Sequence, residues 1–425
     1  MCIRDRQYGV QGFPTIVFAD ASGKPFGGFV GGRSKDDVMK AMQDVYKRQG
    51  EYEKIVQKRL KEYAEKHRGD GVWLDISDRG GCHKMKEKYK VLLLGAGFWG
   101  KRWIRLLNEN ERAECIGIAC AENERKQIAE LSELPLDSIY SDYREAVEKA
   151  DADIMVNVLP AKLHYDADRR ALEKGLHIIT EKPLAESQKE AEELLELASG
   201  RPDQLFMASQ NYRWRSHNVT IKKALDDGMI GRLEAVSFNF RRKEDLQGYR
   251  KDLELPLIND MCIHHFDLLR FFCGADCAEI TARAWRPSWS EYQGKPNVEA
   301  ILCMKNGVMV SYTGTWAARG METSWDGDII LSGDKGCLTL DADNKVCFYP
   351  VANENEEVLD TKKQEPVLIS NVEMEHEETD YGLRYFIRCL DEGTIPETCL
   401  QDNVKSFSMV TACEESARSG KTVKM

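Results

Sequence analysis

Three ionisable side chains in this sequence are candidates for acid–base chemistry. Lys182 follows the apolar run HIIT and precedes Pro183, so its ammonium group would project at the end of a strand. Asp260 and His264 lie four residues apart in LINDMCIHHFDLLRFFCG (257–274), a spacing that a helix places on one face. A lysine in an enclosed site can polarise a substrate oxygen or exchange a proton with it. A histidine, whose reference pKa is near neutrality, can act as a general base.

The segment that carries Asp260 and His264 is otherwise largely apolar, which predicts a mostly buried helix. On such a helix Asp267 and Phe271 would share the face of Asp260 and His264. Ionisable groups on a buried helix need a hydrogen-bonding or oppositely charged partner, or they serve a function. We expect the helix dipole to hold Asp260 anionic near the N-terminus, and Asp260 to raise the pKa of His264. Two alternatives stay open: a structural Asp–His pair in the core, and a metal site formed by Asp260, His264 and Asp267. Lys182 has an alternative too, as a solvated lysine opening a helix.

The stretch KVLLLGAGFWG (90–100) predicts a dinucleotide site. Its four consecutive aliphatic residues suit a strand buried on both faces of a parallel sheet. Gly95 would allow the tight turn, Gly97 would let the backbone approach a pyrophosphate, and Gly100 would let the next helix pack closely. The following segment, 101–111, is a plausible helix whose N-terminal N–H groups would face phosphate.

The next strand, 114–120, ends where an acid usually meets the adenosine ribose. Cys120 stands at that place, and Glu122 is the candidate substitute. The alternative is that Glu122 is a surface charge opening the next helix. No basic residue stands immediately at this turn to bind a 2′-phosphate, although Arg125 and Lys126 are close. We therefore expect the cofactor to be NAD or NADP, with a lean to NAD.

The order of elements predicts two architectures in succession. Strands at 114–120, 153–160, 177–183 and 204–211 alternate with helices, which indicates a doubly wound parallel sheet of the α/β class. From about Leu233 several strands follow one another, with Asn306-Gly307 as a hairpin signal, between a helix at 260–273 and helices at 378–391 and 402–419. This second part predicts an α+β domain with an open antiparallel sheet.

The first 84 residues look foreign to this pattern. MCIRDR (1–6) and DVYKRQ (44–49) are translations, in two frames, of one DNA string that resembles a transposon end used in sequencing libraries. Residues 7–43 resemble the C-terminal half of a thioredoxin-like domain. We expect 1–49 to be an artefactual fragment and 50–84 a non-native leader, with a genuine N-terminal helix as the alternative for the latter. The remaining domains are then 85–210 and 211–425.

Composition excludes several partners. The chain has 425 residues and a net charge of −11, which disfavours a general surface for nucleic acid or anionic membrane. No apolar run approaches the length of a membrane span, and no secretory signal is visible. The 13 cysteines include no C-x-x-C pair, which we interpret as reduced thiols in a cytoplasm.

From Met85 onward the chain resembles the glucose-fructose oxidoreductase / inositol dehydrogenase (Gfo/Idh/MocA) family. The matching stretches agree in order and spacing, and they are GAGFWG (95–100), ADIMVNVLPAKLH (152–164), ALEKGLHIITEKPLAES (171–187), IGRLEAVSF (230–238), DMCIHHFD (260–267), LSGDKGCLTL (331–340) and the end SARSGKTVKM. The resemblance implies a Rossmann domain, an α+β domain, and hydride transfer between a sugar or cyclitol carbinol and NAD(P). It also implies a homo-oligomer built through the open face of the second sheet.

The site residues follow from the same resemblance. Lys182, Asp260 and His264 match the catalytic residues, while Cys262 replaces a glycine of the family pattern and could tighten the pocket. We expect cofactor contacts from Gly95, Gly97, Phe98, Trp99, Gly100, Glu122, Leu159, His164, Glu181 and Lys182. The substrate, a small sugar-like molecule, would be bound by loops such as 241–252, with Arg213, Trp214, Arg215 and Tyr249 as candidate contacts. Two other functions stay open: glycoside cleavage through a transient ketone with no net redox change, and a non-catalytic ligand sensor.

Overall fold

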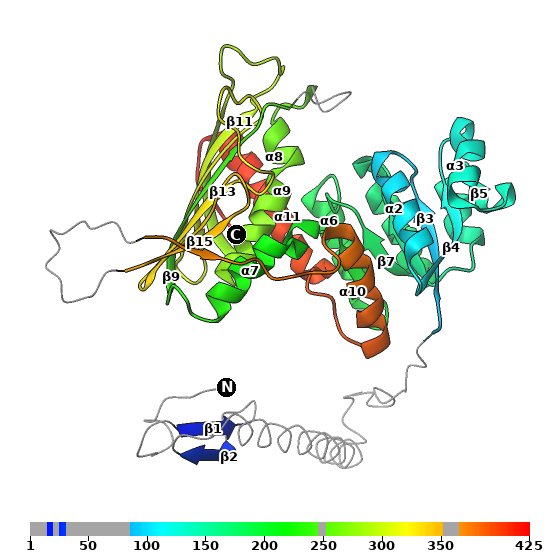
Figure 1. The fold of residues 1–425 in the computed structure, drawn as a ribbon. Helices are drawn as coiled ribbons and strands as arrows, with labels where there is room; N and C mark the ends of the chain where they lie inside the picture. The colour runs from blue at the N-terminus through cyan, green and yellow to red at the C-terminus, as the bar shows by residue number, and fades with distance from the viewer. Residues whose placement is uncertain (1–14, 20–24, 31–85, 245–251, 352–364) are drawn as a thin grey trace, which may run out of the picture. The chain divides into compact units, whose positions relative to one another are not determined.

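The computed structural model describes residues 15–19, 25–30, 86–244, 252–351 and 365–425 (Figure 1). The chain divides into two compact units, Met1–Cys82 and His83–Met425. In the first unit, strands β1 (Thr15–Ala19) and β2 (Pro25–Val30) pair as an antiparallel hairpin. The two scar sequences and residues 50–84 lie outside the described residues.

The second unit begins with a six-stranded parallel sheet, as predicted. Its strand order is β5-β4-β3-β6-β7-β8. The strands are β3 (Tyr89–Leu94), β4 (Ala113–Ala119), β5 (Ile139–Tyr140), β6 (Ile154–Asn157), β7 (His177–Thr180) and β8 (Phe206–Ala208). The helices between them are α2 (Phe98–Glu109), α3 (Arg125–Ser132), α4 (Tyr143–Lys149), α5 (His164–Lys174) and α6 (Gln188–Ser199). The aliphatic run of β3 is fully buried on both faces, which is why it reads as four apolar residues in a row.

A nine-stranded sheet forms the rest of the unit, in the order β16-β15-β14-β13-β9-β12-β11-β10-β17. These strands are β9 (Leu233–Arg241), β10 (Cys277–Trp285), β11 (Asn297–Met304), β12 (Met309–Thr315), β13 (Asp328–Gly333), β14 (Gly336–Leu340), β15 (Val346–Pro350), β16 (Val367–Ile369) and β17 (Val423–Lys424). The strands pair antiparallel, as expected, except that β9 and β12 run parallel, so the sheet is mixed. The helices between β9 and β10 carry the chain back across the sheet, so that β12 ends up beside β9 in the same direction.

Five helices accompany this sheet: α7 (Ser216–Asp226), α8 (Pro256–Asp260), α9 (Cys262–Cys273), α10 (Glu378–Glu392) and α11 (Leu400–Ser419). α9 and α11 bury their apolar residues in one core with the nine-stranded sheet. Figure 1 shows both helices against that sheet. α10 packs in a different core, because Leu383 and Phe386 belong to the cluster that also contains Trp103 and Ile104 of α2. The parallel-sheet half therefore includes a helix from the end of the chain.

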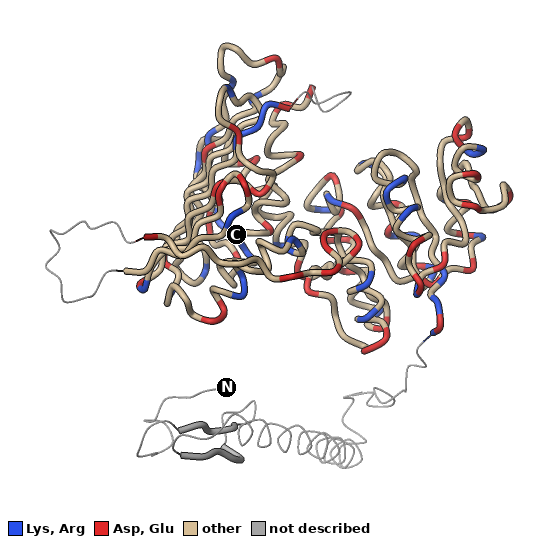
Figure 2. Tube along the Cα trace, in the orientation of Figure 1, with Lys and Arg blue, Asp and Glu red and all other residues tan. Residues whose placement is uncertain are grey.

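Charged residues of both signs occur throughout this unit (Figure 2). Figure 2 shows Lys and Arg interspersed with Asp and Glu along both halves. Among the described residues no helix is long and apolar enough to cross a membrane. The cysteines in the same residues are free thiols.

Candidate active site

Lys182 lies just beyond β7, at the edge where the parallel strands end. Its Nζ donates to the backbone oxygen of Asp260 at 3.1 Å and lies 3.8 Å from Asp260 Oδ1. Both side chains are 16% exposed, so the pair is partly shielded from water. The structure thus brings together two of the three predicted catalytic residues, although they are far apart in sequence.

The predicted helix 260–273 is interrupted at Met261. Asp260 is the last residue of α8 rather than a first-turn residue of a longer helix, and α9 starts at Cys262. Asp260 therefore lies just before the N-cap of α9 and not in the first turn of one continuous helix, as was expected. Cys262 is fully buried, and its thiol lies 3.5 Å from the hydroxyl of Tyr312 in the core.

His264 is buried, at 6% exposure, on the first turn of α9. Burial, followed by the positive charge of Lys182 and then by His265 and Arg215, holds the pKa of His264 well below its usual value. The expectation that Asp260 raises this pKa was wrong, because desolvation and neighbouring cations dominate. A lowered pKa favours the neutral imidazole, which is the form that can accept a proton.

Sequence reasoning missed the residue that packs on His264. The ring of Tyr212 stacks on the imidazole with centroids 4.2 Å apart and planes 12° from parallel. His264 Nδ1 is buried and has no hydrogen-bond partner in the described part of the chain. Tyr212 lies in the short helix η4 (Asn211–Trp214) that follows β8, so a strand end followed by an aromatic residue was the available signal.

The glycine turn has the form of a phosphate cradle. Gly95 has a φ of +104°, and a Cβ there would lie 2.6 Å from the backbone oxygen of Val158. A Cβ on Gly100 would lie 2.2 Å from the oxygen of Gly95, which confirms the predicted close packing of α2. At Gly97, by contrast, a Cβ would meet no protein atom within 4 Å. Gly97 also caps α2 without a side-chain hydrogen bond or an acidic residue in the first turn. Open space before uncapped N–H groups fits a pyrophosphate.

The other predicted cofactor contacts gather at the same edge of the sheet. Phe98 and Trp99 open α2, and Phe98 is 83% exposed. Each ring nitrogen of His164 lies 2.7 Å from a backbone oxygen, Nδ1 from Pro183 and Nε2 from Leu159. His164 thus joins the turn after β6 to the turn after β7. Glu181 is half-buried; desolvation raises its pKa, and it accepts a hydrogen bond from Trp103 Nε1 at 3.4 Å.

Glu122 stands at the end of β4, in the short helix η1 (Glu122–Glu124), and pairs with Arg125 at 3.3 Å. The Arg125 guanidinium also donates to the backbone oxygens of Ile139 and Leu136. The arginine nearest to the predicted ribose site is therefore occupied by contacts within the protein.

Several other predicted residues are held in contacts within the protein. Asp267 is buried and binds Arg213 at 2.6 and 2.7 Å, so both are parts of a structural ion pair. Trp214 is buried, and its Nε1 donates to Glu397. The Arg215 side chain is 14% exposed and donates to Asp326. Tyr249 lies outside the described residues. Within the described ranges, no three His, Cys, Asp or Glu side chains are grouped as metal ligands.

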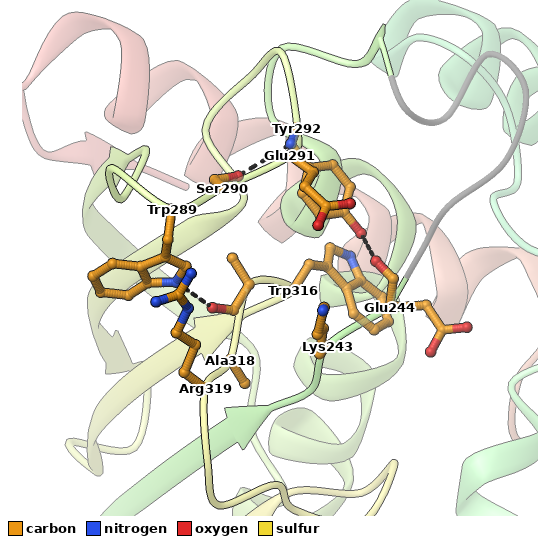
Figure 3. Close-up of a pocket in the computed structure, with 10 residues that line it drawn as sticks. Lys243, Glu244, Trp289, Ser290, Glu291, Tyr292, Trp316, Ala318 and Arg319 are labelled. Carbon is orange, nitrogen blue, oxygen red and sulfur yellow. Dashed lines mark hydrogen bonds between the residues drawn. The ribbon is translucent and has the colours of Figure 1, made fainter.

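A pocket opens at the end of β9 and β12, next to the loop between β10 and β11 (Figure 3). Its aromatic walls are Trp289, Tyr292 and Trp316, and Lys243 and Glu244 line it from the segment predicted to contact substrate. Trp289 Nε1 donates to the backbone oxygen of Ala317 at 2.9 Å, which fixes the ring. Lys182, Asp260 and His264 do not line this pocket.

Comparison with known proteins identifies two family domains in order along the chain. Residues 89–209 match the oxidoreductase family with an NAD-binding Rossmann fold, and residues 218–339 match the GFO/IDH/MocA C-terminal domain. A D-apiose dehydrogenase of Paraburkholderia graminis is 25% identical over 345 residues, covering 80% of this chain and 90% of that relative. An inositol 2-dehydrogenase of an Arthrobacter species is 24% identical over 263 residues, covering 60% and 77%.

Solved structures share the fold. An oxidoreductase from Agrobacterium radiobacter, in complex with NAD+, L-tartaric acid and magnesium, superposes with a TM-score of 0.70 at 22% identity, covering 79% of this chain and 98% of that one. A levoglucosan dehydrogenase in complex with NADH and L-sorbose gives 0.67 at 17% identity, covering 80% and 99%. Together with the glycine cradle and the strand-end lysine, the matches from residue 89 onward show that the chain belongs to the Gfo/Idh/MocA family of NAD(P)-dependent oxidoreductases acting on CH–OH groups.

Proposed function

We propose that this enzyme transfers hydride between a secondary alcohol of a sugar, sugar derivative or cyclitol and the nicotinamide of NAD(P). The observation that supports it best is the pairing of Lys182 with Asp260, together with the buried His264, whose pKa is lowered by burial and then by the charge of Lys182. β3, which leads into the glycine cradle, and β7, which leads into Lys182, flank β6 in the sheet. Because parallel strands end at one edge, the cofactor cradle and the lysine serve one site.

In this proposal each residue has one task. The ammonium group of Lys182 donates a hydrogen bond to the reacting hydroxyl oxygen and stabilises the negative charge that develops on it. The neutral imidazole of His264 accepts the hydroxyl proton as the C–H bond breaks. Asp260 keeps Lys182 in place through its backbone oxygen and balances its charge. A bound nicotinamide would supply the acceptor for the hydride.

The experiment is a panel of sugars and cyclitols with NAD and with NADP, followed by absorbance of the reduced cofactor. With a substrate in hand, His264→Ala is expected to lower kcat by about 100-fold or more while cofactor affinity stays nearly unchanged. Lys182→Ala is expected to lower kcat at least as much. Ile395→Ala, at a residue that is 72% exposed and lies outside the predicted cofactor and acid–base residues, is the control and should keep kcat within a few-fold.

Wild-type turnover by His264→Ala would contradict the assignment of the base. Substrate conversion without net reduction of the cofactor would favour the redox-neutral alternative, in which the same residues create a transient ketone. No turnover of any compound by the cofactor-bound protein would favour the ligand sensor.

We also propose a homo-oligomer built through the open face of the nine-stranded sheet. Ile301, Ile330 and Leu368 are 59%, 45% and 65% exposed. The strand register places them in one row across the sheet, because Ile301 pairs with Ser311, Ser311 with Ser237 and Ser237 with Ile330, and the row continues to Leu368. Exposed aliphatic residues aligned on one face are typical of a protein–protein interface.

A further inference from the structure

Three side chains form a stack that ends at the catalytic histidine. The Arg215 guanidinium carbon lies 3.5 Å from the centroid of the Tyr212 ring, and the His264 imidazole lies 4.2 Å from it, nearly parallel. Two groups that close to one ring centre would overlap if they shared a face. Arg215 and His264 therefore cover opposite faces of Tyr212.

The far end of the stack is fixed by ion pairs from distant elements. Arg215 Nη1 lies 2.5 Å from Asp326 Oδ2, and its Nε lies 3.0 Å from Glu378 Oε1. Asp326 is 1% exposed and also accepts from Asn218 Nδ2 at 2.6 Å. Glu378, at the start of α10, also pairs with Arg102 of α2 at 2.8 Å. The guanidinium is thus bound on two sides and cannot slide off the ring without breaking buried ion pairs.

The near end of the stack lacks such a hydrogen-bonded anchor. Because His264 Nδ1 has no partner among the described residues, no hydrogen bond at that nitrogen sets the plane of the imidazole. Near-parallel contact with an aromatic ring fixes that plane instead. A proton acceptor must be held in a narrow range of orientations, since small displacements cost large factors in rate.

We propose that Tyr212 is a positioning residue for His264, and that Arg215 fixes Tyr212 from its opposite face. Tyr212 touches no reacting atom in this scheme and acts only through the imidazole. The inference rests on the proposed role of His264 as proton acceptor.

Its test compares Tyr212→Met, which fills the space without a ring, with Tyr212→Phe, which keeps the ring. The probe is the NMR signal of histidine Cε1 in the full-length protein, with His264 assigned by the signal that disappears in His264→Gln. A stacked ring shifts this signal upfield. We expect the shift to persist in Tyr212→Phe and to vanish in Tyr212→Met. With a substrate, kcat should fall about ten-fold or more in Tyr212→Met, with cofactor affinity unchanged, and recover in Tyr212→Phe.

Identical His264 signals in the two variants would overturn the proposal. Should Tyr212→Met fail to fold, the pair Arg215→Met with Asp326→Asn removes the clamp and leaves no unpaired carboxylate. The upfield shift should then fall partway, and an unchanged shift would overturn the role of Arg215. The spectroscopic result does not depend on turnover, whereas normal turnover by His264→Gln would refute the assignment of His264 as the proton acceptor and leave the measured stacking unaffected.

Discussion

Asp168 should make the stability of this protein fall as the pH rises. Asp168 is fully buried in α5, where Asn157 Nδ2 donates to its Oδ1 at 2.7 Å. Burial raises the pKa of this carboxyl from 3.8 to about 7, against the opposing hydrogen bonds from Asn157 and Thr180. Asn157 also accepts from the backbone N–H of Leu159, so the buried acid lies directly under a predicted cofactor turn.

The size of the effect follows from the two pKa values. The folded state keeps the Asp168 proton up to about pH 7, whereas the unfolded chain releases it above 3.8. Because the folded-state pKa is the raised one, the stabilisation is complete below pH 3.8 and is lost as pH rises to about 7. At about 1.4 kcal/mol per pKa unit, raising the pH from about 5 to about 8 lowers the free energy of unfolding by on the order of 3 kcal/mol.

The assay is urea unfolding of wild type and Asp168→Asn at those two pH values. Asparagine does not titrate, so the free energy of unfolding of the variant should rise by about 3 kcal/mol relative to that of wild type between the lower and the higher pH. Asp166, on the same helix, is the control. Burial opposes ionisation there, but hydrogen bonds from Arg170, Tyr143 and Arg169 hold its pKa below its usual range. The difference between Asp166→Asn and wild type should therefore be flat over this interval, and an equally flat result for Asp168→Asn would refute the reasoning.

Three further outcomes are expected. Gly97→Val should abolish nucleotide binding measured by calorimetry without lowering Tm, because a Cβ at this position meets no protein atom within 4 Å. The control Gly200→Val, at another uncrowded glycine, should bind nucleotide normally. Nucleotide binding by Gly97→Val would exclude Gly97 from the cradle. A chain starting at Met85 should keep cofactor affinity and Tm, and a drop of Tm by several degrees on truncation would show that the first 84 residues contribute to the fold. Ile330→Lys together with Leu368→Lys should reduce the mass measured by light scattering to that of a monomer, and an unchanged oligomer would place the interface elsewhere.

The parallel sheet could be predicted from sequence because its strands are buried on both faces. The aliphatic run of β3 and the glycines after it specify strand, turn and helix within a dozen residues. The break at Met261 could not be predicted, since both sides of it carry the same apolar pattern. α4 and α7 were missed for a related reason, because short helices of mixed composition give weak periodicity.

For the candidate site too, some features could be predicted from the sequence and others could not. Lys182, Asp260 and His264 were found from residue type and spacing, and the structure places Lys182 against Asp260. The sign of the pKa shift of His264 was not predictable, because it depends on burial and on cations contributed by other segments. Arg213 illustrates the limit: its partner Asp267 is 54 residues away, and nothing local distinguishes an arginine in a buried ion pair from one that binds substrate.

The place of α10 in the parallel-sheet core has a consequence for how the protein is made. Leu383, Phe386 and Ile387 share one buried core with Trp103 and Ile104, yet they leave the ribosome after all the strands of the cofactor half and most of the second sheet. Until then this core lacks the residues that α10 contributes. The nucleotide-binding half is therefore finished last although it is synthesised first, and a fragment ending at residue 210 lacks part of its own interior. Moving this half into another protein would require carrying α10 with it.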